Sequence, residues 1–275
     1  TPLSLAMALW IPGAADAQRP LASPDSIVAV VSRLSGETGP GPDSRFAPRP
    51  STADHIAWLR AELQRRLEPL GGYAVLDTFS AGFTSPEESL RQIYTNVVGV
   101  LPGTAGPGGQ GCYMFGAHLD ATSQRDKDST PGWDPLTAPA PGADDNGSGV
   151  AAVLEAARVL AERNQRPVVD LLFVLFDGEE QQLFDPNKFL LGSAHLADSL
   201  AEADKKLYGF VNLDMVGYNP DGTDSLVVMT NGKSRWLADS VCEANGGCGD
   251  ANDLALTRVV RGLGFSDHGP FWEAG

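Results

Sequence analysis

The sequence predicts an α/β fold: a three-layer α/β/α sandwich with a mixed, mostly parallel central sheet. Strand-like runs alternate with amphipathic helical segments through most of the chain, as happens when helices cover both faces of a sheet. The run from Val168 to Phe176 is almost wholly apolar, which is typical of a central strand buried on both faces. With 275 residues, 42% of them hydrophobic, the chain is long enough to bury one sizeable core.

The individual elements follow from apolar periodicity and from turn residues. A stretch resembling a capping box, Ser51-Thr-Ala-Asp54, opens the second helix, and Asn146 or Ser148 opens the strongly amphipathic third helix. The predicted helices, in order, are 25–34, 51–67, 146–162, 193–203 and 234–244. The predicted strands are 73–79, 96–101, 112–119, 168–176, 207–216 and 225–230.

Charge and the first residues bear on partners and location. Twenty Lys and Arg against 35 Asp and Glu give a net charge of -15, which disfavours nucleic acid and anionic lipid as partners. The apolar run before Ala15-Asp16-Ala17 is typical of an export signal and its cleavage site. We therefore expect residues 1–17 to be a signal-peptide remnant and 18–275 a single secreted or periplasmic domain. No segment approaches the roughly 20 apolar residues that a membrane span requires.

The three cysteines predict no metal site. Cys112 lies in an apolar run and is expected to be a buried strand residue. Cys242 and Cys248 flank a Gly-containing loop, where they either form a small disulfide or remain two free thiols. Without a CxxC pair, a cysteine-bound metal is not expected.

Two pairs of residues at strand ends point to metal chemistry. In an extended backbone His118 and Asp120 point the same way, so the imidazole can bind a metal while the carboxylate holds its other nitrogen. The adjacent Glu179 and Glu180 follow an apolar strand and would repel each other unless a cation compensates. Their side chains diverge, so one can bind a metal and the other can act as a general base.

Three more candidates have plainer explanations when each is taken alone. The plain alternative is an N-terminal cap of the next helix for Asp144-Asp145, a buried hydrogen-bonded carboxylate for Asp214 and a turn residue for His268. Ligand sites of open α/β sheets lie beyond the carboxyl ends of the strands, where these residues gather. Their common position favours one metal site.

Several other motifs do not fit their usual functions. The GxGxxG match at 106–111 precedes a strand instead of joining a strand to a helix, so it does not predict a dinucleotide site. Ser266-Asp267-His268 contains the residue types of a catalytic triad, but sequence neighbours cannot form its chain of hydrogen bonds. Neither GxSxG nor HExxH is present.

The order and spacing of five segments resemble the M28 family of zinc exopeptidases, especially its secreted bacterial aminopeptidases. The resemblance covers roughly residues 95 to 275. The segments are Gly116-Ala-His-Leu-Asp120, Pro141-Gly-Ala-Asp-Asp-Asn-Gly-Ser-Gly149, Phe176-Asp-Gly-Glu-Glu180, Asn212-Leu-Asp-Met-Val-Gly217 and Ser266-Asp-His268.

This resemblance implies a site with two Zn²⁺ ions and five metal ligands. Asp144 would bridge the ions, His118 and Asp214 would complete the ligands of one ion, and Glu180 and His268 those of the other. Family members typically have a cis peptide between the two aspartates, here Asp144-Asp145.

The resemblance also implies the catalytic roles. Glu179 would be the general base, and Asp120 would orient His118. The expected activity is that of an aminopeptidase acting on peptides, and the expected state is a monomer. The family normally continues beyond the last histidine, so the domain is expected to be truncated at its C-terminus.

Two other activities remain open. The segment Gln181 to Ser193 is longer than the family's usual Gly-Leu-Leu-Gly-Ser stretch, and glutaminyl cyclases of the same fold have a comparable insertion. Those enzymes use a single zinc and catalyse intramolecular aminolysis. A carboxypeptidase would use the same metals, so the ligands do not distinguish it from an aminopeptidase. A binding domain without activity is disfavoured, because no ligand is lost.

Overall fold

The structure is a computed structural model that describes residues 22–38, 45, 50–84, 89–105, 111–123, 126–134, 138–180, 189–219, 222–246, 254–262 and 264–274. The expected signal remnant at 1–17 lies outside these residues. The helices are α1 Pro24–Leu34, α2 Pro50–Leu67, α3 Gly147–Glu162, α4 Leu191–Glu202, α5 Arg235–Ala244 and α6 His268–Ala274, with a 3-10 turn at Glu68–Leu70. The strands are β1 Tyr73–Thr84, β2 Ser89–Leu101, β3 Gly111–His118, β4 Asp170–Phe176, β5 Lys206–Asn212, β6 Ser225–Thr230 and β7 Ala255–Val260.

Five strands form the central sheet, in the order β1-β2-β4-β3-β5. β3 pairs in parallel with both β4 and β5, whereas β2 pairs antiparallel with β4 and with β1. The register sets His118 opposite Phe176 and Gly116 opposite Asn212. The carboxyl ends of β3, β4 and β5 therefore meet at one edge of the sheet, and the segments that follow them begin there.

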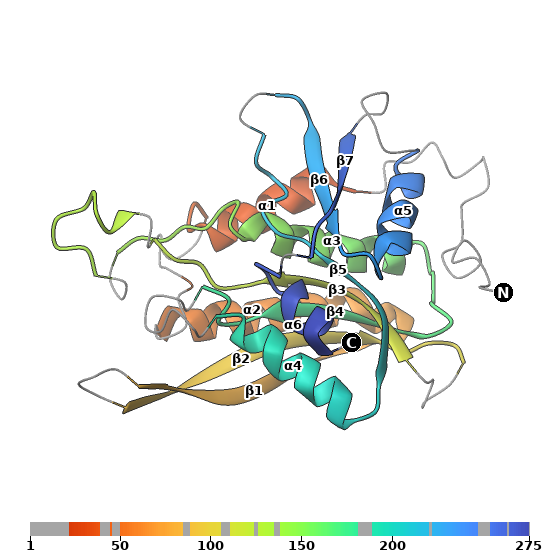
Figure 1. Cartoon of the computed structure of the whole chain (residues 1–275), viewed down its shortest axis with the longest axis horizontal. Helices are drawn as coiled ribbons and strands as arrows, with labels where there is room; N and C mark the ends of the chain where they lie inside the picture. The colour runs from red at the N-terminus through yellow and green to blue at the C-terminus, as the bar shows by residue number, and fades with distance from the viewer. Residues whose placement is uncertain are drawn as a thin grey trace.

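Helices cover both faces of this sheet (Figure 1). On one face α1, α2 and α3 enclose a core that includes Leu59, Leu63, Leu154 and Phe173. On the other face α4 and α6 pack over Met114, Val174 and Phe176, with Leu196 of α4 in the same core and Phe271 of α6 against Phe176 and Phe210. The predicted three-layer α/β/α sandwich with a mixed sheet is confirmed.

Most predicted elements are present, with some changes in their limits. The hairpin strands β1 and β2 are longer than expected, and β5 ends at Asn212, before the expected residue 216. α2 begins at Pro50, so Ser51 to Asp54 form its first turn instead of capping it; proline suits that position because its missing N–H would have no helical partner. The cap of α3 is confirmed, since Asn146 Oδ1 accepts from the amide of Gly149 at 3.0 Å.

The last part of the chain contains elements that the sequence did not predict. β7 pairs in parallel with β6 in a separate two-stranded sheet, which lies beside α5 in Figure 1, far from the β1–β2 hairpin. Cys242 of α5 is disulfide-bonded, whereas Cys112 is buried and free. Cys248, the expected partner, lies outside the described residues. No described helix has the length and apolar character needed to cross a membrane.

Candidate metal centre

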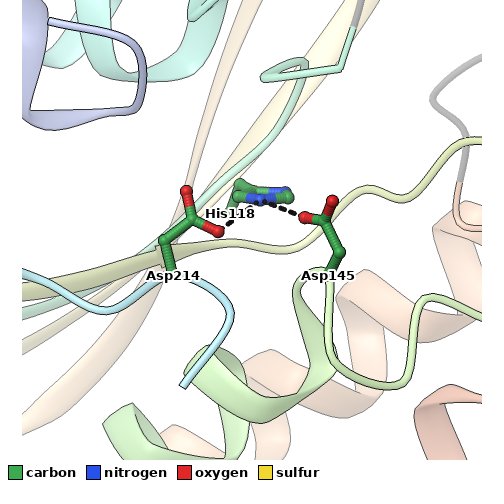
Figure 2. Close-up of side chains that lie close together, drawn as sticks. All are labelled: His118, Asp145 and Asp214. Atoms are coloured by element: carbon green, nitrogen blue, oxygen red, sulfur yellow. Dashed lines mark ion pairs between the residues drawn. The ribbon is translucent and has the colours of Figure 1, made fainter. Parts of the chain in front are cut away.

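The end of β3, the loop before α3 and the segment after β5 bring one imidazole and two carboxylates together (Figure 2). His118 is the last residue of β3, Asp145 lies in the loop just before α3, and Asp214 follows β5 by two residues. His118 Nε2 lies 3.2 Å from Asp145 Oδ1 and 3.5 Å from Asp214 Oδ1. The imidazole is almost completely buried, whereas both carboxylates keep some contact with solvent.

These distances fit a common cation. Ligand atoms held about 2.0–2.1 Å from a tetrahedral zinc lie about 3.3 Å from one another. One histidine nitrogen and two carboxylate oxygens are also the donor types that zinc accepts. Burial alone lowers the pKa of His118, but hydrogen bonding to Asp120, Asp145 and Asp214 raises it well above its ordinary value. The carboxylates therefore stabilise a positive charge on the His118 imidazole, and they would stabilise a zinc ion at the same place.

Asp120 is fully buried and contacts three parts of the site. Its Oδ1 lies 3.6 Å from His118 Nδ1, and its backbone carbonyl lies 3.1 Å from the same nitrogen. Its carboxylate also accepts the backbone amides of Glu179, at 3.2 Å, and Glu180, at 2.9 Å. The structure thus places Asp120 where it can orient His118, as expected, and adds a second contact: it holds the turn that carries both glutamates.

Glu179 and Glu180 lie in the turn after β4 and have strongly perturbed pKa values. Burial, then repulsion by Asp267 and Asp120, raises the pKa of Glu179 to about 9, although His118 opposes the shift. Burial, then repulsion by Asp145 and Asp120, raises the pKa of Glu180 to about 8. Both carboxyl groups therefore interact electrostatically with the group formed by His118, Asp145 and Asp214 or with its neighbours. A cation bound there would lower both pKa values.

The structure places Asp145, and not the expected Asp144, beside His118 and Asp214. The bridging role that the resemblance gives to Asp144 stays a prediction. Asp144 Oδ1 instead accepts from Ser148 Oγ at 2.9 Å and from the amide of Gly217 at 2.8 Å. These bonds engage one oxygen of the carboxylate and connect the loop before α3 to the segment after β5. The expected cis peptide is also displaced by one residue, since the structure has it between Asp145 and Asn146.

His268 is not among the three residues that the structure brings together. It begins α6, and its ring packs edge-on against Trp272 with centroids 4.4 Å apart. It lies near enough to Asp214 to help lower the pKa of that carboxyl, after the opposing effect of burial and the larger contribution of His118. Its predicted metal contact therefore remains a prediction.

Two neighbours of His268 belong to the site but were not predicted. Ser266 Oγ donates to Asp214 Oδ2 at 2.6 Å and accepts from Asn212 Nδ2 at 2.7 Å, which orients the carboxylate. Asp267 is fully buried, and burial raises its pKa to about 7 while His118 opposes the shift. Only its place beside His268 in the Ser-Asp-His segment hinted at this, because burial of a carboxylate is a tertiary property.

Arg45 is a third unpredicted neighbour. It is fully buried and lies close to Asp120 and Asp145, which oppose the lowering of its pKa by burial to about 10. It remains charged at neutral pH. It comes from a Pro- and Gly-rich part of the sequence where no motif marked it.

Comparison with known proteins shows the family of the chain. Residues 96–275 match the model of Peptidase family M28. A "Probable zinc metalloprotease" of Pyrenophora teres f. teres is 33% identical over 172 residues, 60% of this chain and 33% of that protein. "Aminopeptidase YwaD" of Bacillus subtilis is 39% identical over 137 residues, 49% of this chain and 27% of that protein. The chain thus spans about a third of the length of these relatives.

A solved structure of similar fold is the Tannerella forsythia glutaminyl cyclase, with a TM-score of 0.65 and 22% identity, over 93% of this chain and 82% of that one. At this identity the likeness bears on the fold alone. The family match is a match of sequence over most of the chain, so it establishes the family. The chain belongs to Peptidase family M28.

Proposed function

We propose that this chain is the catalytic part of an exported zinc aminopeptidase that removes neutral or apolar residues from the N-terminus of peptides. The observation that carries the proposal is the convergence of His118, Asp145 and Asp214 beside the buried Glu179 and the partly buried Glu180. Such a concentration of acids is unfavourable in the metal-free protein and becomes favourable when a divalent cation is bound.

Five residues would hold two zinc ions in this proposal. His118, Asp145 and Asp214 would bind one ion, and Asp145 would share its carboxylate with a second ion held by Glu180 and His268. The first three are supported by their mutual distances, Glu180 by its charge interaction with Asp145, and His268 by the sequence resemblance. Zinc held by these residues would supply Lewis-acid chemistry, which polarises a carbonyl and lowers the pKa of water.

Glu179 would move the proton during hydrolysis. Its carboxylate would take a proton from the attacking water and give it to the departing amine. Asp120 serves this step by holding the Glu179 amide and the His118 imidazole, so that base and ligand keep their relative positions. A cation nearby would lower the pKa of Glu179 from about 9, so that its carboxylate ionises more readily and can accept a proton from water.

Charge favours the amino end of a peptide over its carboxyl end. The described site is rich in carboxylates, which attract a protonated α-amino group. A carboxypeptidase needs a cation that the terminal carboxylate of its substrate can reach. Arg45, which lies beside the carboxylates of Asp120 and Asp145, is fully buried. Near the ligands, the exposed side chains of Met215, Tyr218 and Phe265 supply apolar surface for an N-terminal side chain.

Export is supported by two features. The apolar run ending at Ala17 resembles a cleaved signal, and Cys242 is disulfide-bonded, as is usual in oxidising compartments. Mass spectrometry of the protein recovered outside the cytoplasm tests this: an N-terminus near Gln18 is expected, whereas a retained 1–17 segment in an intracellular protein contradicts export.

Glutaminyl cyclase activity is the second candidate. The long segment between Glu180 and Ser193 favours it, because glutaminyl cyclases of this fold have a comparable insertion. A cyclase would release ammonia from an N-terminal glutaminyl peptide without cleaving a peptide bond.

The test uses the protein loaded with zinc and three peptides of one sequence. One has a free N-terminal leucine, one is N-acetylated, and one begins with glutamine. We expect release of free leucine from the first peptide, no cleavage of the second, and loss of activity with a chelator. Cleavage of the blocked peptide from its C-terminus would establish a carboxypeptidase, and ammonia release from the glutaminyl peptide a cyclase. Zinc analysis should give two ions per chain, and one in His268→Ala.

A further inference from the structure

The guanidinium of Arg45 joins the two loops that carry the proposed metal ligands. Its Nε donates to the carbonyl of Leu119 at 2.7 Å, and its Nη1 and Nη2 donate to the carbonyls of Pro141 and Gly142, both at 2.9 Å. Leu119 lies between His118 and Asp120. The other two carbonyls lie a few residues before Asp145, so one planar group spans both sides of the site.

A backbone hydrogen bond closes the loop that carries Asp145 at the residue that Arg45 contacts. The carbonyl of Gly142 accepts from the amide of Gly147, the first residue of α3, at 2.9 Å as well as from Arg45. Gly142 has φ of +51°, and a Cβ there would lie 2.5 Å from the side chain of Ala121 and 2.8 Å from Arg45 Nη2. Segment 142–147 therefore has little freedom to move relative to the guanidinium.

The remaining contacts connect Arg45 to the rest of the fold. Nη1 also donates to the carbonyl of Leu34, at the end of α1, at 2.5 Å. The amide of Leu119 donates to the carbonyl of Phe176 at 2.7 Å, at the end of β4. These contacts fix the two ligand-bearing loops relative to α1 and to the sheet, as well as relative to each other. The guanidinium is suited to this because its donors lie in one rigid plane.

We propose that Arg45 is a positioning residue of the metal centre, which holds Asp145 at the distance from His118 that a shared zinc ion requires. The proposal rests on the proposed metal site. A buried arginine with a purely structural role would stabilise the fold without changing zinc affinity. Arg45 is expected to do both, because three of its four acceptors lie within a few residues of His118, Asp120 or Asp145.

The test compares Arg45→Met with Arg66→Met as a matched control. Arg66 is also nearly fully buried, but it lies at the end of α2 and donates to Glu62. Zinc Kd is measured by competition with a chromogenic chelator, at a temperature where circular dichroism shows each protein folded. We expect Arg45→Met to weaken zinc binding at least about tenfold, as the loss of an orienting neighbour typically does. Arg66→Met should lose stability and keep the wild-type Kd.

Activity at saturating zinc gives a second measurement. In Arg45→Met, kcat should fall while KM changes less than about twofold, because the proposal assigns Arg45 no substrate contact. An Arg45→Met protein with wild-type Kd and a lowered Tm would overturn the proposal and leave the metal site intact. A wild-type protein that binds no zinc would instead overturn the proposed function.

Arg45→Lys keeps the test decisive if Arg45→Met does not fold. Lysine retains the charge and much of the volume, but a single ammonium cannot reach all four carbonyls in one plane. We expect a zinc Kd weakened at least about threefold. A Kd equal to that of the wild type would show that charge suffices and would overturn the positioning role.

Discussion

The two ends of β4 carry carboxylates in opposite electrostatic states. At the start of the strand, Asp170 accepts from the amide of Gly103 at 2.9 Å and from Lys205 Nζ at 2.5 Å. Burial opposes ionisation there, but these two bonds outweigh it and lower the pKa of Asp170. Just past the end of the same strand, burial and repulsion between acids raise the pKa values of Glu179 and Glu180.

The difference separates an end of the strand whose charge is balanced within the chain from an end where, in the proposed function, a cation would balance it. Asp170 is neutralised by a side chain of the same chain, so its end of the sheet is complete as folded. The acids at the other end face one another, and a cation from solution would relieve the repulsion. Conflicts between local electrostatics and stability of this kind concentrate at functional sites.

Glu179→Gln should produce the largest effect at the catalytic end of β4. The amide cannot accept a proton from water, so we expect kcat to fall at least 10²-fold, toward the upper range of about 10⁴ for loss of general-base catalysis. Zinc content, measured by elemental analysis, should stay at the wild-type level because Glu180 and the other ligands remain. Wild-type turnover in this variant would remove Glu179 from the mechanism.

The pair Asp145→Asn and Asp144→Asn tests which aspartate of the loop binds metal. Asp145→Asn should weaken zinc binding by more than tenfold, because it removes a ligand charge 3.2 Å from His118. Asp144→Asn should keep zinc content near that of the wild type, because its oxygen faces Ser148 and Gly217. The reverse result, measured by zinc titration of both variants, would restore the bridging role expected from the sequence.

The pH dependence of stability should differ with and without zinc. In the metal-free protein the pKa values of Glu179, Glu180 and Asp267 are about 9, 8 and 7, above the ordinary values of 4.5 and 3.8. The folded state then binds more protons than the unfolded state, and the raised pKa of His118 adds in the same direction.

The stability that these groups contribute is therefore full below about pH 4 and is lost as the pH rises toward 9. Thermal melts between pH 5 and 9 should show Tm falling with pH in the metal-free protein and a flatter curve with zinc, which lowers these pKa values. Identical slopes in the two states would mean that the cation does not reach these acids.

Asp170→Asn should have the smallest effect, and only at the stabilising end of β4. Loss of the ion pair with Lys205 should lower the free energy of unfolding by about 1 kcal/mol, as for partly exposed pairs. The measurement is urea unfolding of the zinc-loaded protein, with zinc Kd as the accompanying control. A changed Kd would show that the two ends of β4 are coupled.

Local patterns were sufficient to predict most of the fold. The apolar run of β4 and the amphipathic pattern of α3 each indicate how one element is buried. Such a pattern lies within a short stretch of sequence, so it can be read without knowing the tertiary contacts. β7 and α6 were missed because each is short and has no clear period. The positions of His118 and Asp214 at the ends of strands could be predicted in the same way, because each strand ends close to where its apolar run ends.

The rest of the site depends on tertiary contacts. Asp144 and Asp145 are chemically identical, and the choice between them is made by Ser148 and Gly217, which bind the carboxylate of Asp144. Arg45 and Asp267 become part of the site only because distant segments bury them there. No periodicity or motif spacing reports such burial.

The parallel pairing of β3 with β5 has a consequence for the order of events in folding. The segments α3, β4 and α4 intervene between these strands, so their pairing closes a long loop and is intrinsically slow. Asp214 reaches His118 only once that pairing exists. In the proposed function, a cation would therefore stabilise a nearly complete sheet and would not start its assembly.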